Sequence, residues 1–417
     1  MGCLDMGSET KISVWSRKPL RAYLNIIKLS LERRLRKRRL ASLPFVLYLE
    51  PNTFCNLSCP SCPTGTKQLG RPKTKVTIDE FKNSIDALGE YIFLLVMYNW
   101  GEPLLHQEFP RLVRYATAKH IVVHASSNLS MQLSEERCRD IVLSGLQLLL
   151  VGVDGATPET HESYRRGSNL PLVHENLRKL VRIKKSLKSE TPHIVAIFLV
   201  FEHNEHELED FKKQMDEIGV RYDATAPFLP PSSGLKKSKN EEFDRYLKGA
   251  ANCNNLRRKG NTLAPCTWLY YSSIINPGGS ISPCCMVANE NFDFGKINQT
   301  PKNWNALLSD FRESWNGDKY RSARGLFQKD CLIEWSKNNL TALNQDGMAL
   351  SQVNKNVSII CEECPIPDEI EIWSHFIQEM CTAFASSSIK ELISFKLRNG
   401  LSLAFKASLL RIAWWLQ

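Results

Sequence analysis

Three cysteines near the start of the chain have the spacing of a metal-binding loop. Cys55, Cys59 and Cys62 stand in the order C-x3-C-x2-C, directly after the apolar run 45–50. Three thiolates on one short loop can bind three irons of a cubic iron-sulfur cluster and leave the fourth iron open. An open iron can bind a small molecule and pass it an electron. The spacing therefore predicts a reactive cluster site.

A zinc site and a disulfide framework are the two alternatives to a cluster for these cysteines. A zinc site usually needs a fourth ligand close by, and the nearest candidates are distant in the sequence. A disulfide framework fits poorly because the chain has 13 cysteines, an odd number, and no recognisable secretory signal. We therefore expect free thiols in a reducing, cytoplasmic compartment.

A second set of cysteines lies in the last third of the chain. Cys266 and Cys284 frame the pattern C-x12-G-x4-C around Gly279, and Cys361-x2-Cys364 follows downstream. Four thiolates in two pairs can close a cluster completely, which makes it an electron carrier. A structural zinc ion bound by the same four cysteines is the alternative.

The elements that position these residues alternate regularly between strand and helix. Apolar runs of strand length recur six times from Phe45, and amphipathic segments of helical period separate them. This alternation predicts an α/β fold with a parallel sheet, a partial (β/α)6 TIM-like barrel whose site lies at the carboxyl ends of the strands. The expected strands are 45–50, 91–98, 121–124, 148–153, 193–201 and 222–226.

The cysteine loop after the first strand, followed by Gly-Glu-Pro after the second, resembles the radical S-adenosylmethionine (SAM) enzymes. The resemblance implies that the open iron of a 4Fe-4S cluster chelates SAM and that one electron breaks a carbon-sulfur bond, giving a 5'-deoxyadenosyl radical that abstracts hydrogen from the substrate. The second cysteine set resembles the SPASM and twitch extensions of this family, which implies one auxiliary 4Fe-4S cluster. The implied cluster ligands are Cys55, Cys59, Cys62, Cys266, Cys284, Cys361 and Cys364.

The resemblance also implies a set of residues that bind SAM. The family's Gly-Gly-Glu-Pro motif, which binds the SAM amino group, has tryptophan in place of its first glycine here. Ser61 stands where the family often has an aromatic residue against adenine. The implied SAM contacts are Trp100, Gly101, Glu102 and Pro103 of the motif, with Ser126, Asn128, Asp154 and Arg165 after later strands. No general base stands out among Asp154, His161, Arg165 and His203.

The two ends of the chain carry most of its positive charge. Residues 1–45 have a net charge of +8 and residues 386–417 of +4, so the middle is slightly acidic and is not a nucleic-acid surface. Leu20, Leu24, Ile27, Leu31 and Leu35 predict a basic amphipathic helix, either packed on the enzyme body or in peripheral contact with a membrane. The predicted units are 1–44 (this helix), 45–228 (barrel), 229–259 (linker and helix), 260–380 (auxiliary-cluster domain) and 381–417 (basic tail).

The resemblance implies that the enzyme oxidises its substrate, with the auxiliary cluster accepting an electron and a flavodoxin or ferredoxin supplying one. No peptide-binding winged-helix domain is evident at the N-terminus. We therefore expect dehydrogenation of a sugar, cyclitol or lipid-linked substrate. A peptide-modifying SPASM maturase is the first alternative, and a zinc-stabilised binding protein without catalysis is the second.

Overall fold

The computed structural model describes residues 17–227, 229, 233–240, 243, 265–300, 303–325 and 327. Cys361, Cys364 and the predicted tail 381–417 lie outside these residues. Within the described part, no helix combines the length and the apolar character needed to cross a membrane.

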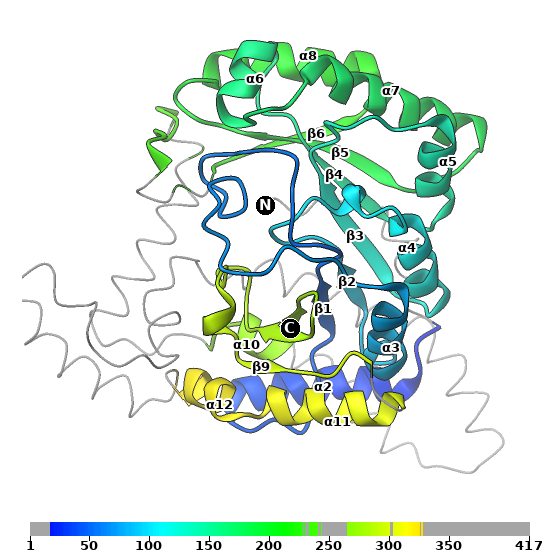
Figure 1. Ribbon diagram of the computed structural model, residues 1–417, viewed down its shortest axis with the longest axis vertical. Helices are drawn as coiled ribbons and strands as arrows, with labels where there is room; N and C mark the ends of the chain where they lie inside the picture. The colour runs from blue at the N-terminus through cyan, green and yellow to red at the C-terminus, as the bar shows by residue number, and fades with distance from the viewer. Residues whose placement is uncertain are drawn as a thin grey trace, which may run out of the picture.

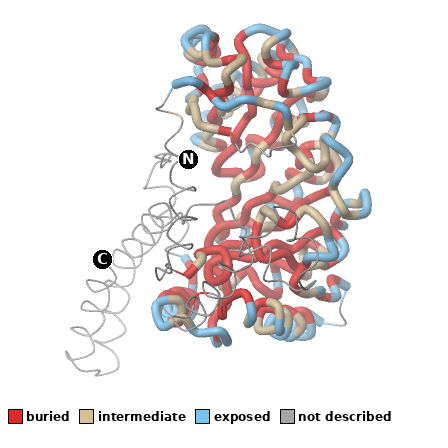
Figure 2. Tube along the Cα trace, turned by 90° about the vertical axis from the view of Figure 1, so that its left-hand side faces the viewer, coloured by how far each residue is buried: buried red, intermediate tan, exposed pale blue. Residues whose placement is uncertain are grey.

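Six parallel strands form the curved sheet that the sequence predicts (Figure 1). Neighbours along the chain are neighbours in the sheet, and every connection between them crosses over through at least one helix. The apolar side chains of β1 to β4 are mostly buried, as Figure 2 shows along the middle of the molecule, whereas those of the edge strand β6 are half-buried. The strands are β1 (Val46–Leu49), β2 (Leu94–Val96), β3 (Val122–Ser127), β4 (Leu148–Gly152), β5 (His193–Leu199) and β6 (Arg221–Thr225).

Helices cover the outer side of this sheet (Figure 1). The predicted capping box begins α3: Thr77 Oγ1 accepts from the Glu80 N–H at 3.2 Å, and the Glu80 carboxylate accepts from the Thr77 N–H at 2.7 Å. Helix α8 ends at Gly219, whose φ of +79° a side chain would strain. The helices are α3 (Ile78–Leu88), α4 (Phe109–Ala118), α5 (Glu135–Leu143), α6 (Pro158–Tyr164), α7 (Leu170–Ser186) and α8 (Leu208–Ile218), with 3-10 turns η1 (Pro103–Leu105) and η2 (Glu205–Glu207).

The segment after the predicted linker extends the same sheet. Strand β7 (Ser272–Ile275) pairs in parallel with β1, and β8 (Ser280–Ser282) and β9 (Gly295–Lys296) continue in antiparallel fashion. Gly279, the glycine of the C-x12-G-x4-C pattern, makes the tight turn possible, since a Cβ there would lie 2.2 Å from the Ile297 carbonyl oxygen. The sheet is not closed, because β6 and β9 are its two edges. The segment adds α10 (Trp268–Tyr271), η5 (Glu290–Phe292), α11 (Trp304–Trp315) and α12 (Asp318–Gly325).

The predicted N-terminal helix, α2 (Leu20–Arg34), lies against the amino ends of β1 and β2. Tyr23 packs edge-on against Phe93, just before β2, with ring centroids 5.2 Å apart. Asn25 exchanges two hydrogen bonds of 2.8 Å with the backbone of Leu43, just before β1. Lys18 Nζ donates to the carbonyl of Gly89 at 2.7 Å, beyond the end of α3. The helix therefore packs at the ends of β1 and β2 opposite those that lead into the predicted site.

The face of α2 that packs on the body is not the predicted stripe. Ala22, Tyr23, Ile26 and Leu29 are buried, whereas the leucines of the stripe face outward and are 37–67% exposed. The predicted leucine stripe is apolar and has helical spacing. Ala22, Tyr23 and Ile26 form a second apolar face, which the spacing of the leucines alone does not reveal, and this second face packs on the body.

Candidate active site

The three cysteines of the first motif come together in one packed group at the carboxyl end of β1. Cys59 is buried, Cys55 and Cys62 are half-buried, and none is in a disulfide. Burial, with smaller contributions from the other two thiols and from Glu102, raises the pKa of the Cys55 thiol to about 12. Binding of a cationic cluster would displace these protons.

The loop supplies three free thiols, the donors that a cubic iron-sulfur cluster takes at three of its corners. Gly65 lets the loop fold back on itself, since a Cβ there would lie 2.5 Å from the Cys59 backbone nitrogen. The three free thiols therefore fit the donor set of a cluster with an open corner.

The Trp-Gly-Glu-Pro loop after β2 is held against the cysteine loop by a buried glutamate, Glu50. One oxygen of the Glu50 carboxylate accepts from the N–H groups of Trp100 and Gly101, both at 2.6 Å. The Trp100 carbonyl in turn accepts from Thr64 Oγ1 at 2.8 Å, two residues beyond Cys62. The N–H groups of Trp100 and Gly101 thus both point toward Glu50. The tryptophan that replaces the family's first glycine does not prevent these contacts.

Gly101 tolerates no side chain at this point. A Cβ on Gly101 would lie 2.0 Å from the Asn52 carbonyl oxygen. Asn52, just after β1, also donates to the Glu102 carbonyl at 2.9 Å. The motif therefore lies directly against the segment that leads into the cysteine loop.

The Glu102 carboxylate connects the second and third strand ends. It accepts from the Leu104 N–H at 3.0 Å, and from Ser127 Oγ and the Asn128 N–H, both at 2.8 Å. Burial raises the pKa of this carboxyl, while these three hydrogen bonds stabilise its charged form. Pro103 is buried and begins the 3-10 turn η1.

Asn128 is a predicted contact that reaches the cysteine loop. Its Nδ2 is 3.6 Å from Cys55 Sγ and 3.0 Å from Asn56 Oδ1. Ser126 lies inside β3 rather than after it and is half-buried. The hydroxyl bonded to Glu102 belongs to its neighbour Ser127, which sequence reasoning did not single out.

Asp154, which is buried, and Arg165, which is half-buried, form an ion pair beside the cysteine loop. The Arg165 Nε donates to one oxygen of Asp154, and the other oxygen accepts from the Leu199 N–H at 2.7 Å. Gly152 leaves room for the guanidinium, because a Cβ there would lie 2.3 Å from its Nη2. Arg165 also stabilises the thiolate form of Cys59, although burial raises the pKa of that thiol.

Two histidines considered as general bases differ in their surroundings. His161 is fully buried, accepts from the Asp154 N–H at 3.1 Å through Nδ1, and has Ser168 Oγ 2.9 Å from its Nε2. Burial lowers its pKa to about 4, so it is neutral and its two ring nitrogens are both engaged. His203 stacks on Phe201 with ring centroids 5.1 Å apart. His161 therefore positions the Asp154 loop.

Cys266 and Cys284 of the second set come together beside β1. Both pack in one group with Trp268, and Cys285 joins them. The Trp268 ring lies 4.9 Å from that of Tyr48 on β1. The predicted partners Cys361 and Cys364 lie outside the described residues, so two of the four predicted ligands are brought together here.

A buried ion pair connects the cysteine loop with the segment after β8. Arg71 makes two bonds to the Asp293 carboxylate, 2.6 and 2.7 Å long, and donates to Ser282 Oγ at 2.9 Å and to the Val287 carbonyl at 3.1 Å. The two charged side chains are 2% and 6% exposed. The first cysteine loop and the loop that carries Cys284 are thus joined by side-chain contacts.

Comparison with known proteins agrees with this geometry. The model of the radical SAM superfamily matches residues 49–215, and that of the SPASM iron-sulfur cluster-binding domain matches residues 266–365. The chain belongs to the radical SAM superfamily and has a C-terminal SPASM domain. The radical SAM family uses SAM and a 4Fe-4S cluster, and its SPASM domain binds auxiliary iron-sulfur clusters.

Curated relatives match parts of the chain. An AdoMet-dependent heme synthase from Methanosarcina barkeri is 29% identical over 153 residues, 37% of this chain and 42% of that protein. Mycofactocin maturase MftC from Mycobacterium ulcerans is 27% identical over 179 residues, 42% and 46% of the two chains. The PqqA peptide cyclase of Bradyrhizobium diazoefficiens is 24% identical over 264 residues, 58% and 67%. The first two matches span less than half of each relative.

Solved structures share the fold. The crystal structure of Streptococcus suis SuiB superposes with a TM-score of 0.50 at 13% identity, covering 70% of this chain and 69% of that one. This likeness agrees with a partial barrel joined to a SPASM domain.

Glu50 is the main site residue that sequence reasoning missed. Its signal was a carboxylate at the end of an otherwise apolar strand, a position where burial demands a partner. Arg71 carried no such signal, because its partner Asp293 is more than 200 residues away in the sequence.

Proposed function

We propose that this enzyme modifies a peptide by abstracting a hydrogen atom from one of its carbons. The observation that carries the proposal is the alignment to the PqqA peptide cyclase, the longest of the three described above, which covers 58% of this chain and 67% of that protein. The expected dehydrogenation of a sugar, cyclitol or lipid-linked substrate finds no support among the relatives, which favour the alternative of a peptide maturase.

The open sheet suits an extended substrate. Strand β6 is an edge whose residues are exposed or half-buried, and its backbone pairs with β5 on one side. An extended peptide can add to such an edge through main-chain hydrogen bonds. A small rigid substrate gains nothing from an open edge, so this feature supports a peptide over a sugar.

We assign roles to the residues at the strand ends. Cys55, Cys59 and Cys62 would hold the first cluster, and Cys266 and Cys284 would take part in an auxiliary one. When bound, the first cluster and SAM supply a carbon-centred radical that takes hydrogen from the substrate. Glu50 and Glu102 would hold the Trp100–Pro103 loop, which the family uses to bind the SAM amino group, against the cysteine loop.

Arg165 is the group assigned to the SAM carboxylate. Its Nε donates to Asp154, and the guanidinium also lies beside Cys59, so the group stands next to the proposed cluster, where its fork could bind a carboxylate. Asn128, 3.6 Å from Cys55 Sγ, is placed to orient a ligand at the open corner of the cluster. Ser126 is half-buried on β3 and is assigned to the SAM ribose.

The test is anaerobic reconstitution of the full chain with iron, sulfide and dithionite, followed by incubation with SAM and candidate precursor peptides. We expect 5'-deoxyadenosine and a change in peptide mass, with deuterium moving from a labelled peptide into 5'-deoxyadenosine. SAM cleavage with transfer of deuterium from a labelled sugar instead would contradict the peptide substrate and leave the radical chemistry standing. Bound zinc without SAM cleavage would favour a non-catalytic binding protein.

A matched pair of cysteine variants separates cluster loss from unfolding. Cys59→Ala removes a predicted ligand, whereas Cys138→Ala removes a buried cysteine on α5, far along the chain from either cysteine set. We expect Cys59→Ala to abolish SAM cleavage and Cys138→Ala to retain it.

A further inference from the structure

We propose that α2 docks the enzyme on an anionic phospholipid surface, with its outward leucines entering the interface and the arginines at its C-terminal end binding lipid phosphates. The proposal concerns the ends of β1 and β2 opposite those that lead into the active site, and it is independent of the substrate.

The outward face of α2 is a continuous apolar stripe. Leu20, Leu24, Leu31 and Leu35 are 48%, 46%, 37% and 67% exposed. At 100° per residue they fall in one narrow row along the helix, on the side opposite Ala22 and Leu29. Because the buried face already supplies the contact with the barrel, the leucine row is not needed for packing.

The same helix presents an excess of positive charge around this row. Its one acidic residue, Glu32, is buried and turned inward, where its carboxylate accepts from the N–H groups of Ala41 at 3.0 Å and Ser42 at 3.3 Å. The outer surface is therefore cationic as well as apolar. The exposed basic residues of the segment are Arg17, Arg21, Lys28, Arg34, Lys37, Arg38 and Arg39.

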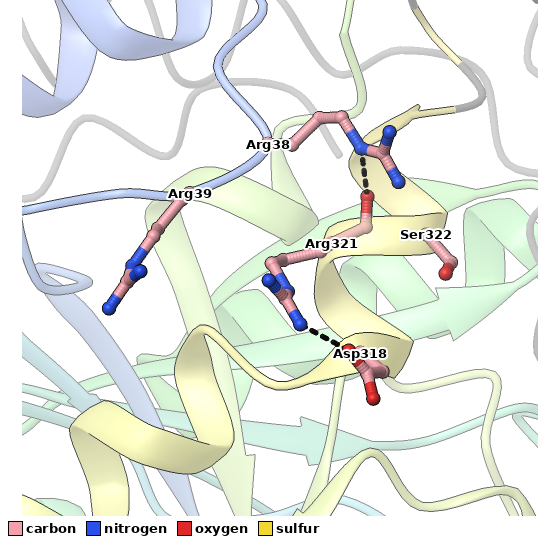
Figure 3. A pocket seen from close by; sticks show the side chains of 5 residues that line it. All are labelled: Arg38, Arg39, Asp318, Arg321 and Ser322. Atoms are coloured by element: carbon pink, nitrogen blue, oxygen red, sulfur yellow. Dashed lines mark hydrogen bonds and ion pairs between the residues drawn. The ribbon is translucent and has the colours of Figure 1, made fainter.

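A basic pocket lies at the C-terminal end of the row (Figure 3). It has a volume of about 420 Å³ and is lined by Arg38, Arg39 and Arg321, with Asp318 and Ser322. Arg321 pairs with Asp318, and Arg38 Nε donates to the Arg321 carbonyl at 3.2 Å, which holds its guanidinium at the opening. Within the described part of the chain, Arg38 and Arg39 have no carboxylate partner. Guanidinium groups suit the oxygens of a phosphate.

Charge decides which partner this face fits. Two copies of α2 meeting face to face would bring like charges together, so a second copy of the chain is disfavoured. An apolar row flanked by Lys and Arg is the pattern of helices that lie in the plane of an anionic interface. Phosphate-binding arginines beside the row fit the head groups of that same surface.

The experiment is co-sedimentation of the full-length holoenzyme with vesicles of phosphatidylcholine alone, or mixed with phosphatidylglycerol in about a 2:1 ratio. We expect binding to the anionic vesicles only, weakened by added salt. Leu24→Glu/Leu31→Glu and, separately, Arg38→Glu/Arg39→Glu should each bind at least about tenfold more weakly.

The matched control places the same kinds of substitution on α5. Arg139→Glu/Leu143→Glu changes one exposed arginine and one leucine that is 53% exposed, away from α2, and should bind as the wild type does. Unchanged 5'-deoxyadenosine formation shows that each variant is folded.

Three results would overturn the proposal. The first is failure of the wild-type enzyme to bind anionic vesicles. The second is wild-type binding by both α2 variants, which would place the contact elsewhere on the chain. The third is a dimer in solution that the leucine variant converts to a monomer without any vesicle binding, which would make the row an interface between copies.

Discussion

Glu50 is a buried carboxyl group with two backbone donors on one oxygen and none, among the described residues, on the other. Burial raises its pKa to about 7, against the opposing effect of those donors and of the charge on Arg71. At pH 5 to 7 the folded protein therefore holds a proton that an unfolded chain, with a carboxyl pKa near 4.5, has released. The contribution of Glu50 to the free energy of unfolding must therefore fall as the pH rises through this range.

Replacing Glu50 with glutamine should remove that dependence. Glutamine keeps the oxygen that accepts from Trp100 and Gly101 but cannot ionise. We expect the stability of Glu50→Gln, measured by urea unfolding at pH 5, 6 and 7, to fall less than that of the wild type, with a difference on the order of 3 kcal/mol at most. If the stabilities of the two proteins change with pH in parallel, Glu50 does not titrate in this range.

Glu50→Ala serves as the contrasting variant. It loses the acceptor as well as the charge and leaves two buried N–H groups unpaired, so it should be less stable than Glu50→Gln at every pH by about 1–3 kcal/mol.

At the scale of elements, periodicity and capping signals were enough to predict the barrel. All six strands lie within or overlap the predicted ranges, and helices separate them as the predicted alternation requires, because each element buries an apolar face. The hairpin of β7 and β8 was not predicted, since Ser and Asn within it hide the alternation of a strand. The cysteines on either side of this hairpin were a clearer indication of the segment's role than its strand pattern.

The loop after β8 carries two adjacent cysteines, of which sequence alone favours Cys284. Cys284 is buried and Cys285 is half-buried, and both pack against the same group. We expect Cys284→Ala to lose about four irons per chain relative to the wild type and Cys285→Ala to keep them, as measured by iron and sulfide analysis. The reverse result would move the ligand by one residue and shift the predicted spacing to C-x12-G-x5-C.

At the scale of the molecule, the two cysteine regions are parts of one sheet joined by the Arg71–Asp293 pair. Sequence alone could not predict this arrangement, because nothing local marks the pairing of β7 with β1 or a bond across more than 200 residues. It depends on chain topology, which periodicity does not specify.

Removing one of the two charges of this buried pair should lower the free energy of unfolding. Asp293→Asn leaves the Arg71 charge buried beside a neutral partner, so we expect a loss of about 3–5 kcal/mol in the free energy of unfolding. The double variant Arg71→Met/Asp293→Leu should lose less than the sum of the two single changes.

The pair of Arg111 and Glu108 provides the comparison, since those side chains are 63% and 40% exposed. Removal of Arg111 should cost less than about 1 kcal/mol. Equal costs for the two pairs would mean that the Arg71–Asp293 contact is not the buried link between the two regions.

The position of α2 also constrains where a substrate comes from. The helix packs beside the amino ends of β1 and β2, whereas the cysteine loop follows the carboxyl end of β1. An enzyme resting on a bilayer by α2 would therefore keep the cysteine loop at the end of β1 that is farther from the lipid. A nascent or soluble chain could then approach that loop from the aqueous phase.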